Sequence, residues 1–168
     1  MQSSPTSPTL RAASSEDDSL MLAVYSSTRA DEMALVDWTD EQKQSFLQMQ
    51  FNAQRTSYLR EYSNAEYFVI LNDGVEAGRL IVDRSGDALL IVDIAVLPEH
   101  RNSGIGRSLI EDLQDEARKN KKLLRLHVEN FNRAQRLYER LGFQKVAEVS
   151  FYWRMEWDPA TADMAQVA

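Results

Sequence analysis

The chain has 168 residues, 43% of them hydrophobic, and a formal net charge of -7 at pH 7. This length fits one globular domain, the acidic balance argues against general nucleic-acid binding, and no apolar run is long enough to span a membrane. Because the chain has no cysteine and only two histidines, His100 and His127, disulfides and thiolate chemistry are excluded and a mechanism without a metal is favoured.

Both ends of the chain lack the pattern of a packed element. Residues 1–8 are dominated by Ser, Thr and Pro and show neither the basic nor the apolar region of a signal peptide, so we expect a flexible tail and a cytoplasmic protein. Residues 158–168 have no apolar period and are predicted to form a second flexible tail. The sequence therefore predicts a single domain over residues 9–157.

Two helices are predicted in the first part of this domain. The stretch SSEDDSLMLAVYSSTRA offers Ser14 or Ser15 as an N-cap, followed by acids and by apolar residues at helical spacing. The second helix begins at a capping box formed by Thr39 and Gln42 and extends to about residue 62. Its candidate inward-facing residues are Phe46, Met49, Ala53 and Leu59.

From Glu66 the hydrophobic period becomes that of strands. The runs EYFVIL, EAGRLIVDR and ALLIVDIAVL are separated by turn sequences at residues 72–74 and 85–87, which predicts an antiparallel meander with a central third strand. A helix over about residues 104–120, the strand LLRLHV, a helix over about residues 133–141 and strands at 143–148 and 150–157 follow. This order predicts a mixed sheet in an α/β protein.

A loop with two glycines precedes the helix at residues 104–120. Its sequence, RNSGIG at residues 101–106, delivers backbone N–H groups to the positive end of a helix dipole, and glycines let a phosphate approach the backbone closely. Arg101 adds a positive charge suited to phosphate. The spacing fits neither a P-loop nor a dinucleotide-binding fingerprint. An ordinary strand-to-helix turn is the alternative.

The charges of the chain are unevenly distributed. Residues 1–100 hold 7 Lys+Arg and 16 Asp+Glu, which gives a net charge of -9. Residues 146–168 hold 1 Lys+Arg and 4 Asp+Glu, which gives a net charge of -3. Residues 101–145 hold 11 Lys+Arg and 6 Asp+Glu, which gives a net charge of +5. This basic segment begins at the glycine loop, which favours an anionic ligand there, whereas solvated helix charges are the alternative.

The loop, preceded by IAVLPEH, and the later segment NRAQRLYERLGF together resemble the GNAT superfamily of acetyl-coenzyme A-dependent N-acetyltransferases. The resemblance covers about residues 9–157. It implies a mixed, mostly antiparallel sheet of about six or seven strands with a central splay, flanked by about four helices. It also implies acetyl-coenzyme A (acetyl-CoA) as cosubstrate and a small-molecule or peptide amine as acceptor, without a metal.

The resemblance assigns coenzyme contacts residue by residue. Backbone amides of the loop would bind the pyrophosphate, with Arg101 beside them; the loop positions are Asn102, Ser103, Gly104, Ile105, Gly106 and Arg107. The backbone of Ile94, Ala95 and Val96, on the strand that splays from its neighbour, would hold the pantetheine arm and the acetyl carbonyl. Asn132 is a further candidate contact, although the motif asparagine commonly stands one residue earlier, where this chain has Phe131.

Acetylation of an amine needs a proton for the departing thiolate and an acceptor for the proton of the amine. By resemblance Tyr138 is the general acid, because a phenol stays protonated at neutral pH; packing within an amphipathic helix is the alternative. The base is open. His127 lies on the other side of the splay and titrates in a suitable range, Asp93 and Glu129 compete with it, and water can also carry the proton.

The acidic remainder of the chain predicts a cationic acceptor, such as a polyamine, an amino sugar or a peptide, unless these acids are only solvated surface charge. One face of VSFYWRMEW, and the aromatic residues of the second helix, either line the acceptor site or pack in the structure. We expect no nucleic-acid or membrane partner and consider a homodimer possible. The rival to the enzyme is a non-catalytic acyl-coenzyme A-binding module with the same fold.

Overall fold

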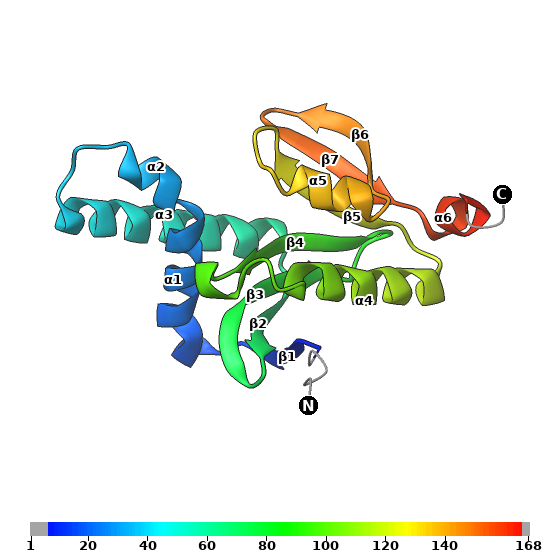
Figure 1. Ribbon diagram of the computed structural model, residues 1–168, viewed down its shortest axis with the longest axis horizontal. Coiled ribbons are helices and arrows are strands. Elements are labelled where there is room, and N and C mark those ends of the chain that lie inside the picture. Colours follow the sequence, from blue (N-terminus) through cyan, green and yellow to red (C-terminus); the bar gives the residue numbers. More distant parts are fainter. Residues whose placement is uncertain (1–6, 166–168) are drawn as a thin grey trace.

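The computed structural model describes residues 7–165, which form a seven-stranded sheet with helices on both faces (Figure 1). The strands lie in the order β1-β2-β3-β4-β5-β7-β6, and every neighbouring pair is antiparallel except β4 and β5, which are parallel. The strands are β1 (Thr9–Ala12), β2 (Glu66–Asn72), β3 (Val75–Asp83), β4 (Leu89–Val96), β5 (Leu124–Glu129), β6 (Gln144–Val149) and β7 (Tyr152–Trp157). The predicted mixed, mostly antiparallel sheet is confirmed.

The part of the chain that the structure describes contains six α-helices and two 3-10 turns. These are η1 (Ser15–Asp17), α1 (Asp18–Thr28), α2 (Ala30–Ala34), α3 (Asp40–Glu61), η2 (Pro98–His100), α4 (Ile105–Asn120), α5 (Gln135–Arg140) and α6 (Pro159–Ala165). The two helices beyond the expected four are α2 and α6, of five and seven residues. None of the helices within residues 7–165 is long and apolar enough to cross a membrane.

The two faces of the sheet are covered by different helices. On one face α4 and α5 pack over a core that includes Leu80, Ile91, Leu126 and Met155. On the other face α1 and α3 pack over a smaller cluster, in which Tyr25 and Phe51 lie with their ring centroids 5.9 Å apart. Side chains alternate between the faces along each strand, so the sheet separates two surfaces that a substrate could approach.

Helix α3 starts as predicted but packs differently. The hydroxyl of Thr39 accepts from the backbone N–H of Gln42, whose side chain accepts from the N–H of Thr39, which completes the capping box. The expectation that Met49, Ala53 and Leu59 face inward is wrong, since all three are exposed, whereas Phe51 is buried. The helix touches the rest of the domain along a narrow stripe, and its first half projects with α2 beyond the sheet (Figure 1).

The segment after the last strand is partly helical rather than a loose tail. Asp158 accepts from the backbone N–H of Ala160 at the start of α6, and Pro159 is buried. Asp163 pairs with Arg118 of α4 at 3.1 Å, and Ala162 packs on the main core. This helix is short and contacts the rest of the domain through only a few residues, so its sequence shows no apolar period. Residues 1–6 of the predicted first tail, and 166–168 of the second, lie outside the described part of the chain.

Strands β4 and β5 diverge as predicted. Their parallel ladder comprises Leu89, Leu90 and Ile91 opposite residues 124–126, and it ends there. Beyond Ile91, β4 continues to pair only with β3, and β5 beyond residue 126 pairs only with β7, within the described residues. The register shift at Ile81/Val82 leaves Val92 as a bulged residue at the point of divergence. The splay therefore exposes one backbone edge of residues 92–96.

Candidate active site

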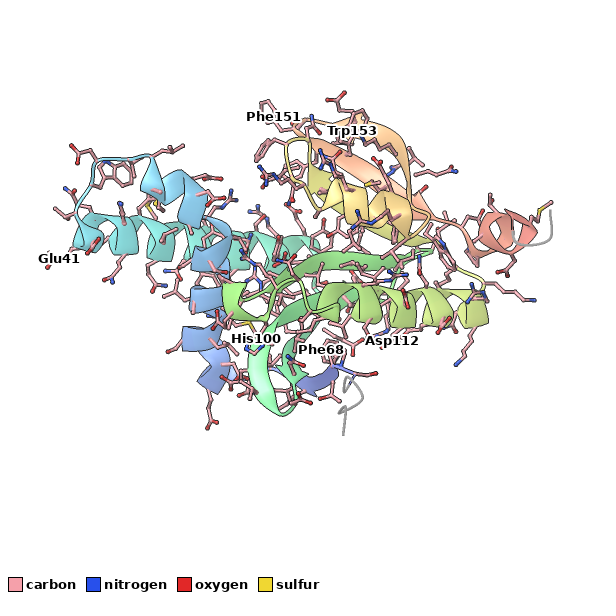
Figure 2. The ribbon with its side chains drawn as sticks, viewed as in Figure 1. Glu41, Phe68, His100, Asp112, Phe151 and Trp153 are labelled. Carbon is pink, nitrogen blue, oxygen red and sulfur yellow. The ribbon has the colours of Figure 1, made fainter. Side chains whose placement is uncertain are left out.

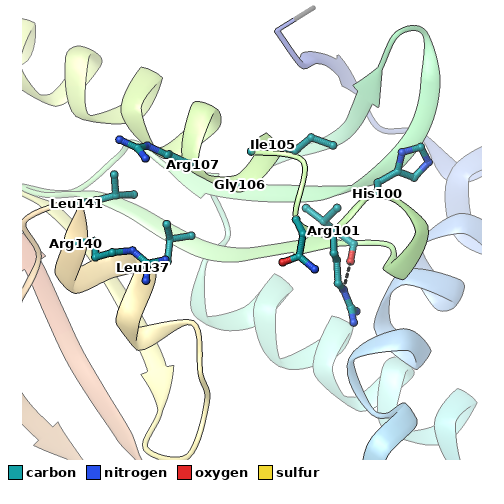
Figure 3. A pocket seen from close by; sticks show the side chains of 11 residues that line it. His100, Arg101, Ile105, Gly106, Arg107, Leu137, Arg140 and Leu141 are labelled. Carbon is teal, nitrogen blue, oxygen red and sulfur yellow. Dashed lines mark hydrogen bonds between the residues drawn. The ribbon is translucent and has the colours of Figure 1, made fainter. Parts of the chain in front are cut away.

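A pocket of about 760 Å³ lies beside the splay, on the face covered by α4 and α5 (Figure 3). It is lined by Val96, His100, Arg101, Asn102, Gly104, Ile105, Gly106, Arg107, Leu137, Arg140 and Leu141. Three arginines and no carboxylate line it, so the pocket is suited to an anionic ligand. The predicted loop thus forms one wall of the pocket, and Val96, at the end of β4, reaches it.

The N-terminus of α4 points its free backbone amides at this pocket. Gly104 is the N-cap residue with φ +82°, a conformation that favours glycine, and no side chain caps the helix. No acidic residue stands in the first turn, in contrast to α3, where Asp40 and Glu41 do. The positive end of the α4 dipole is therefore uncompensated by the protein, which is the arrangement that binds phosphate.

The loop residues divide into those that face the pocket and those that hold the loop. Gly106 has no atom within 4 Å of the position that a Cβ would take. Ile105 is buried in the main core, and Ser103 donates a hydrogen bond to the carbonyl oxygen of His100. The side chain of Arg107 lines the pocket and pairs with Glu111 at 2.7 Å. The packing of the protein therefore does not require a glycine at residue 106.

Tyr138 lies on α5 and is 8% exposed. Its ring packs on Phe143, with the centroids 5.9 Å apart. Burial, together with the nearby charge of Asp93, raises the pKa of Tyr138 to about 12. Tyr138 thus packs within the core, as the structural alternative predicted. Its phenol also stays protonated far above neutral pH and can serve as a proton donor.

The base candidates occupy different environments. His127 is exposed on β5, opposite Arg154 of β7, and partial burial and the cations Arg125 and Arg154 lower its pKa. Its imidazole is therefore neutral at neutral pH and able to accept a proton. Glu129 lies 3.7 Å from the guanidinium of Arg29, which links the end of β5 to the start of α2.

Asn132 has a structural role that its motif position did not reveal. Its side-chain oxygen accepts from the backbone N–H of Ala134 at 2.9 Å and so fixes the turn that leads into α5. Several predicted site residues are absent from the described residues that line the pocket: Ile94, Ala95, Ser103, His127, Asn132 and Tyr138. The structure brings the loop and Val96 together in one cavity, with Tyr138 on the helix that forms its other wall.

Sequence reasoning missed the wall that α5 supplies. Leu137, Arg140 and Leu141 line the pocket from this helix, and His100 does so from η2. The three helical residues are spaced i, i+3 and i+4, so they share one face of the helix, adjacent to Tyr138 in the sequence. This spacing is the sequence signal from which they could have been predicted, because a cation, Arg140, on the same helix face as two leucines indicates a surface that is not only core.

Comparison with known proteins agrees with this geometry. The family model described as an acetyltransferase (GNAT) domain matches residues 63–145, about half of the chain, from β2 to the start of β6. The matched segment includes the splay, the loop, α4 and α5. A comparison with curated protein sequences finds no significant match.

Solved structures share the fold at low sequence identity. The PaiA N-acetyltransferase of Thermoplasma acidophilum, in complex with coenzyme A, has a TM-score of 0.67 and 16% identity over 91% of this chain and 99% of its own. The spermidine N-acetyltransferase of Vibrio cholerae, in complex with coenzyme A and spermine, has a TM-score of 0.63 and 20% identity over 91% of this chain and 96% of its own. The ribosomal-protein-S18-alanine N-acetyltransferase of Escherichia coli has a TM-score of 0.59 and 23% identity over 90% of this chain and 93% of its own.

The family match thus covers the segment that carries both predicted motifs, and the shared fold extends over nine tenths of the chain. Together they establish that the chain belongs to the GNAT superfamily and is an acyltransferase of that superfamily.

Proposed function

We propose that the protein transfers an acetyl group from acetyl-CoA directly to a primary amine of a small, cationic molecule or peptide. The observation that carries this proposal is the splay between β4 and β5, which adjoins the cationic pocket on one face of the sheet and opens to the other face. A coenzyme in the pocket could present its thioester at this opening. The coenzyme A bound by the relatives from Thermoplasma and Vibrio supports this choice of cosubstrate.

In the proposed complex, the amides at the start of α4 bind the pyrophosphate, with Arg107 and Arg140 nearby. The exposed backbone edge of Ile94, Ala95 and Val96 binds the pantetheine arm, much as a strand would pair there. Asn132 contributes by holding the turn before α5. These contacts place the thioester near Tyr138 without any step that requires a cysteine or a metal.

The reaction is a direct transfer. The lone pair of the neutral amine attacks the thioester carbonyl carbon, and the resulting tetrahedral intermediate collapses with cleavage of the carbon–sulfur bond. Tyr138 donates its proton to the departing thiolate and is reprotonated from solvent. An acceptor that arrives as an ammonium first loses one proton to solvent, and the nitrogen loses a second proton as the amide forms, to His127, whose lowered pKa keeps the imidazole available, or to water.

Two measurements test the proposal. Calorimetry with coenzyme A measures binding, and free-thiol release from acetyl-CoA measures turnover over a panel containing spermidine, glucosamine and a lysine peptide, with acetylated products confirmed by mass spectrometry. We expect both binding and acceptor-dependent thiol release. Coenzyme binding without thiol release for any amine would favour the non-catalytic acyl-coenzyme A module. Absence of coenzyme binding would refute both functions.

A further inference from the structure

A buried ion pair lies on the face of the sheet opposite the coenzyme pocket. Arg79 of β3 is 4% exposed, and its guanidinium contacts the carboxylate of Asp93 on β4 and donates to Gln54 of α3 at 2.9 Å. Leu80 and Val82 belong to the core under α4, so Arg79, which alternates with them, points to the α3 side. This pair belongs neither to the pocket nor to the predicted coenzyme contacts.

The bulge at Val92 places Asp93 at the splay. Asp93 is opposite Ile81, on the same face as Arg79, and it is the second residue of β4 beyond the last pair with β5. It directly precedes Ile94, the first of the three residues whose backbone is proposed to hold the acetyl arm. A carboxylate therefore stands at the opening, on the side from which an acceptor must come if the coenzyme occupies the α4 side.

Only part of this carboxylate is occupied by the protein. Arg79 contacts one oxygen, Oδ2, whereas no hydrogen bond within residues 7–165 engages Oδ1. The side chain of Asp93 is 22% exposed, while that of Arg79 is 5% exposed. Arg79 is thus the more deeply buried member of the pair, and the exposed part of the Asp93 carboxylate remains accessible to a cation, which it attracts at short distance.

The charge of this carboxylate influences two tyrosines. The charges of Asp93 and Arg79 both act on Tyr58 of α3, whose pKa burial raises well above its usual value, and Tyr152 of β7 acts on it as well. The charge of Asp93 also acts on Tyr138 from the other face. A primary ammonium has three N–H donors, and the Oδ1 oxygen of Asp93 provides an acceptor for one of them.

We propose that Asp93, held by Arg79 and Gln54, is the residue that binds the acceptor's ammonium group before transfer, and that it selects primary aliphatic amines, which are charged at neutral pH, over uncharged aromatic amines. This inference rests on the proposed function. Asp93 is the specificity-determining residue in contact with the acceptor, and Arg79 is a positioning residue that orients the carboxylate.

The test measures acceptor binding separately from coenzyme binding. With the protein saturated with coenzyme A, calorimetry follows the binding of spermidine and phenethylamine, and of 4-ethylaniline as the uncharged amine of similar size to phenethylamine. We expect the two ammonium probes to bind and Asp93→Asn to weaken them about tenfold or more, as loss of a charge-assisted contact predicts. The affinity for coenzyme A should change less than about twofold.

Asp93→Asn leaves a buried guanidinium unpaired and can prevent folding, so two further variants separate charge from stability. Arg79→Gln keeps the carboxylate but loses the residue that orients it, so ammonium binding should weaken only in part, whereas Arg79→Gln with Asp93→Asn has no unpaired charge and should lose ammonium binding. The proposal is overturned if neither ammonium probe binds the wild-type protein, if the double variant binds them as well as Arg79→Gln does, or if 4-ethylaniline binds as tightly as phenethylamine.

Activity data distinguish failure of this inference from failure of the proposed function. Thiol release with an acceptor whose KM is unaffected by the double variant would overturn the role of Asp93 and leave the acetyltransferase standing. If Asp93 binds the ammonium, the double variant raises KM for charged acceptors more than it lowers kcat. A merely structural role would lower the melting temperature and the affinity for coenzyme A together.

Discussion

The guanidinium of Arg101 donates a hydrogen bond from Nε to the carbonyl oxygen of Val96, 2.9 Å away, and so ties the glycine loop to the end of β4 (Figure 3). Its Nη2 lies 3.4 Å from the hydroxyl of Ser27 on α1. The cation that looked from the sequence like a phosphate ligand is therefore already engaged by the protein. The backbone amides at the start of α4 remain the groups available to a phosphate.

Replacing Gly106 by valine should weaken coenzyme binding more than Arg101→Ala does. A side chain at Gly106 meets no protein atom within 4 Å but enters the pocket where the phosphate is proposed to lie. Loss of one charge-assisted contact is worth about 1.5–3 kcal/mol, so we expect the dissociation constant of coenzyme A to rise about tenfold or more. Calorimetry with coenzyme A checks this.

Gly86 provides the matched control for this glycine. It lies in the turn before β4, and a Cβ there would come no closer than 3.8 Å to another group. Gly86→Val should leave coenzyme affinity unchanged. Gly104→Val is a poorer test because φ +82° strains any residue other than glycine. Unchanged affinity in a folded Gly106→Val protein would contradict a phosphate site at this helix end.

Tyr138→Phe should preserve the fold and coenzyme affinity while turnover falls. The ring that packs on Phe143 is retained and only the hydroxyl is deleted. General acid catalysis is worth about 10²–10⁴-fold, so kcat should drop by that factor on an acceptor for which chemistry limits the rate. Burial raises the pKa of Tyr138 to about 12, so the wild-type rate should show no loss from its ionisation up to about pH 10. Wild-type turnover in the variant would remove Tyr138 from the mechanism.

The elements with strong local signals were predictable, and those held by distant contacts were not. The capping box of Thr39 and Gln42, the strand meander and the start of α4 at Gly104 follow from neighbours in the sequence. Strand β1 was missed because the only strand that Thr9–Ala12 pairs with among the described residues is β2, at residues 68–71. No local pattern records a partner about 60 residues away.

The same distinction applies to the candidate site. The loop and Tyr138 could be proposed because they belong to contiguous motifs, whereas the hydrogen bond between Arg101 of the loop and Val96 could not. The pair of Arg79 and Asp93 joins two strands, and Gln54 reaches it from a helix 25 residues away in the sequence. Its only sequence signal is a charged residue within each of two apolar runs, EAGRLIVDR and ALLIVDIAVL.

Gly78→Ala should disturb the end of β4 and with it the site. A Cβ at Gly78 would collide with the carbonyl oxygen of Ala95 on the neighbouring strand. This oxygen belongs to the backbone, so it cannot move aside as a flexible side chain could. Overpacking of this kind costs about 1–3 kcal/mol. For a chain of this length that corresponds to a fall in the melting temperature of about 2–12 °C, with weaker coenzyme binding. Thermal unfolding beside Gly86→Ala tests this; equal melting temperatures would show that β3 and β4 can separate without cost.

If His127 is the base, the pH profile of kcat should show its titration. Partial burial, with Arg125 and Arg154 nearby, lowers the pKa of His127 below its usual value of about 6.5, while Glu156 acts in the opposite direction. The base works when neutral, so activity should be full at pH 7 and fall only as the pH drops through this lowered pKa. His127→Gln should abolish that limb. A midpoint above about 6.5, or a limb that persists in the variant, would assign it to another group.

The acceptor should be cationic, and its KM should rise with salt. The projecting segment of α2 and the start of α3 carries the exposed acids Asp31, Glu32, Asp37, Asp40 and Glu41, the last of these near its outer end (Figure 2). Only Arg29 and Lys43 offset them, and Arg29 is itself paired with Glu32 at 2.9 Å. Such an acidic surface raises the local concentration of cations, and salt screens the effect over about 10 Å at 0.1 M.

Because the steering charges act on the encounter and not on the chemical step, raising the salt from about 0.05 M to 0.5 M should increase KM for spermidine and leave kcat nearly unchanged. The double variant Asp37→Asn with Glu41→Gln removes two of the exposed acids without touching the splay, so it should reduce this salt dependence while coenzyme affinity stays constant. Steady-state kinetics at several salt concentrations measure both effects. If KM is indifferent to salt, or an anionic amine such as a free amino acid is the best acceptor, the acids of α2 and α3 serve only solvation, and the charge argument fails while the acetyltransferase assignment stands.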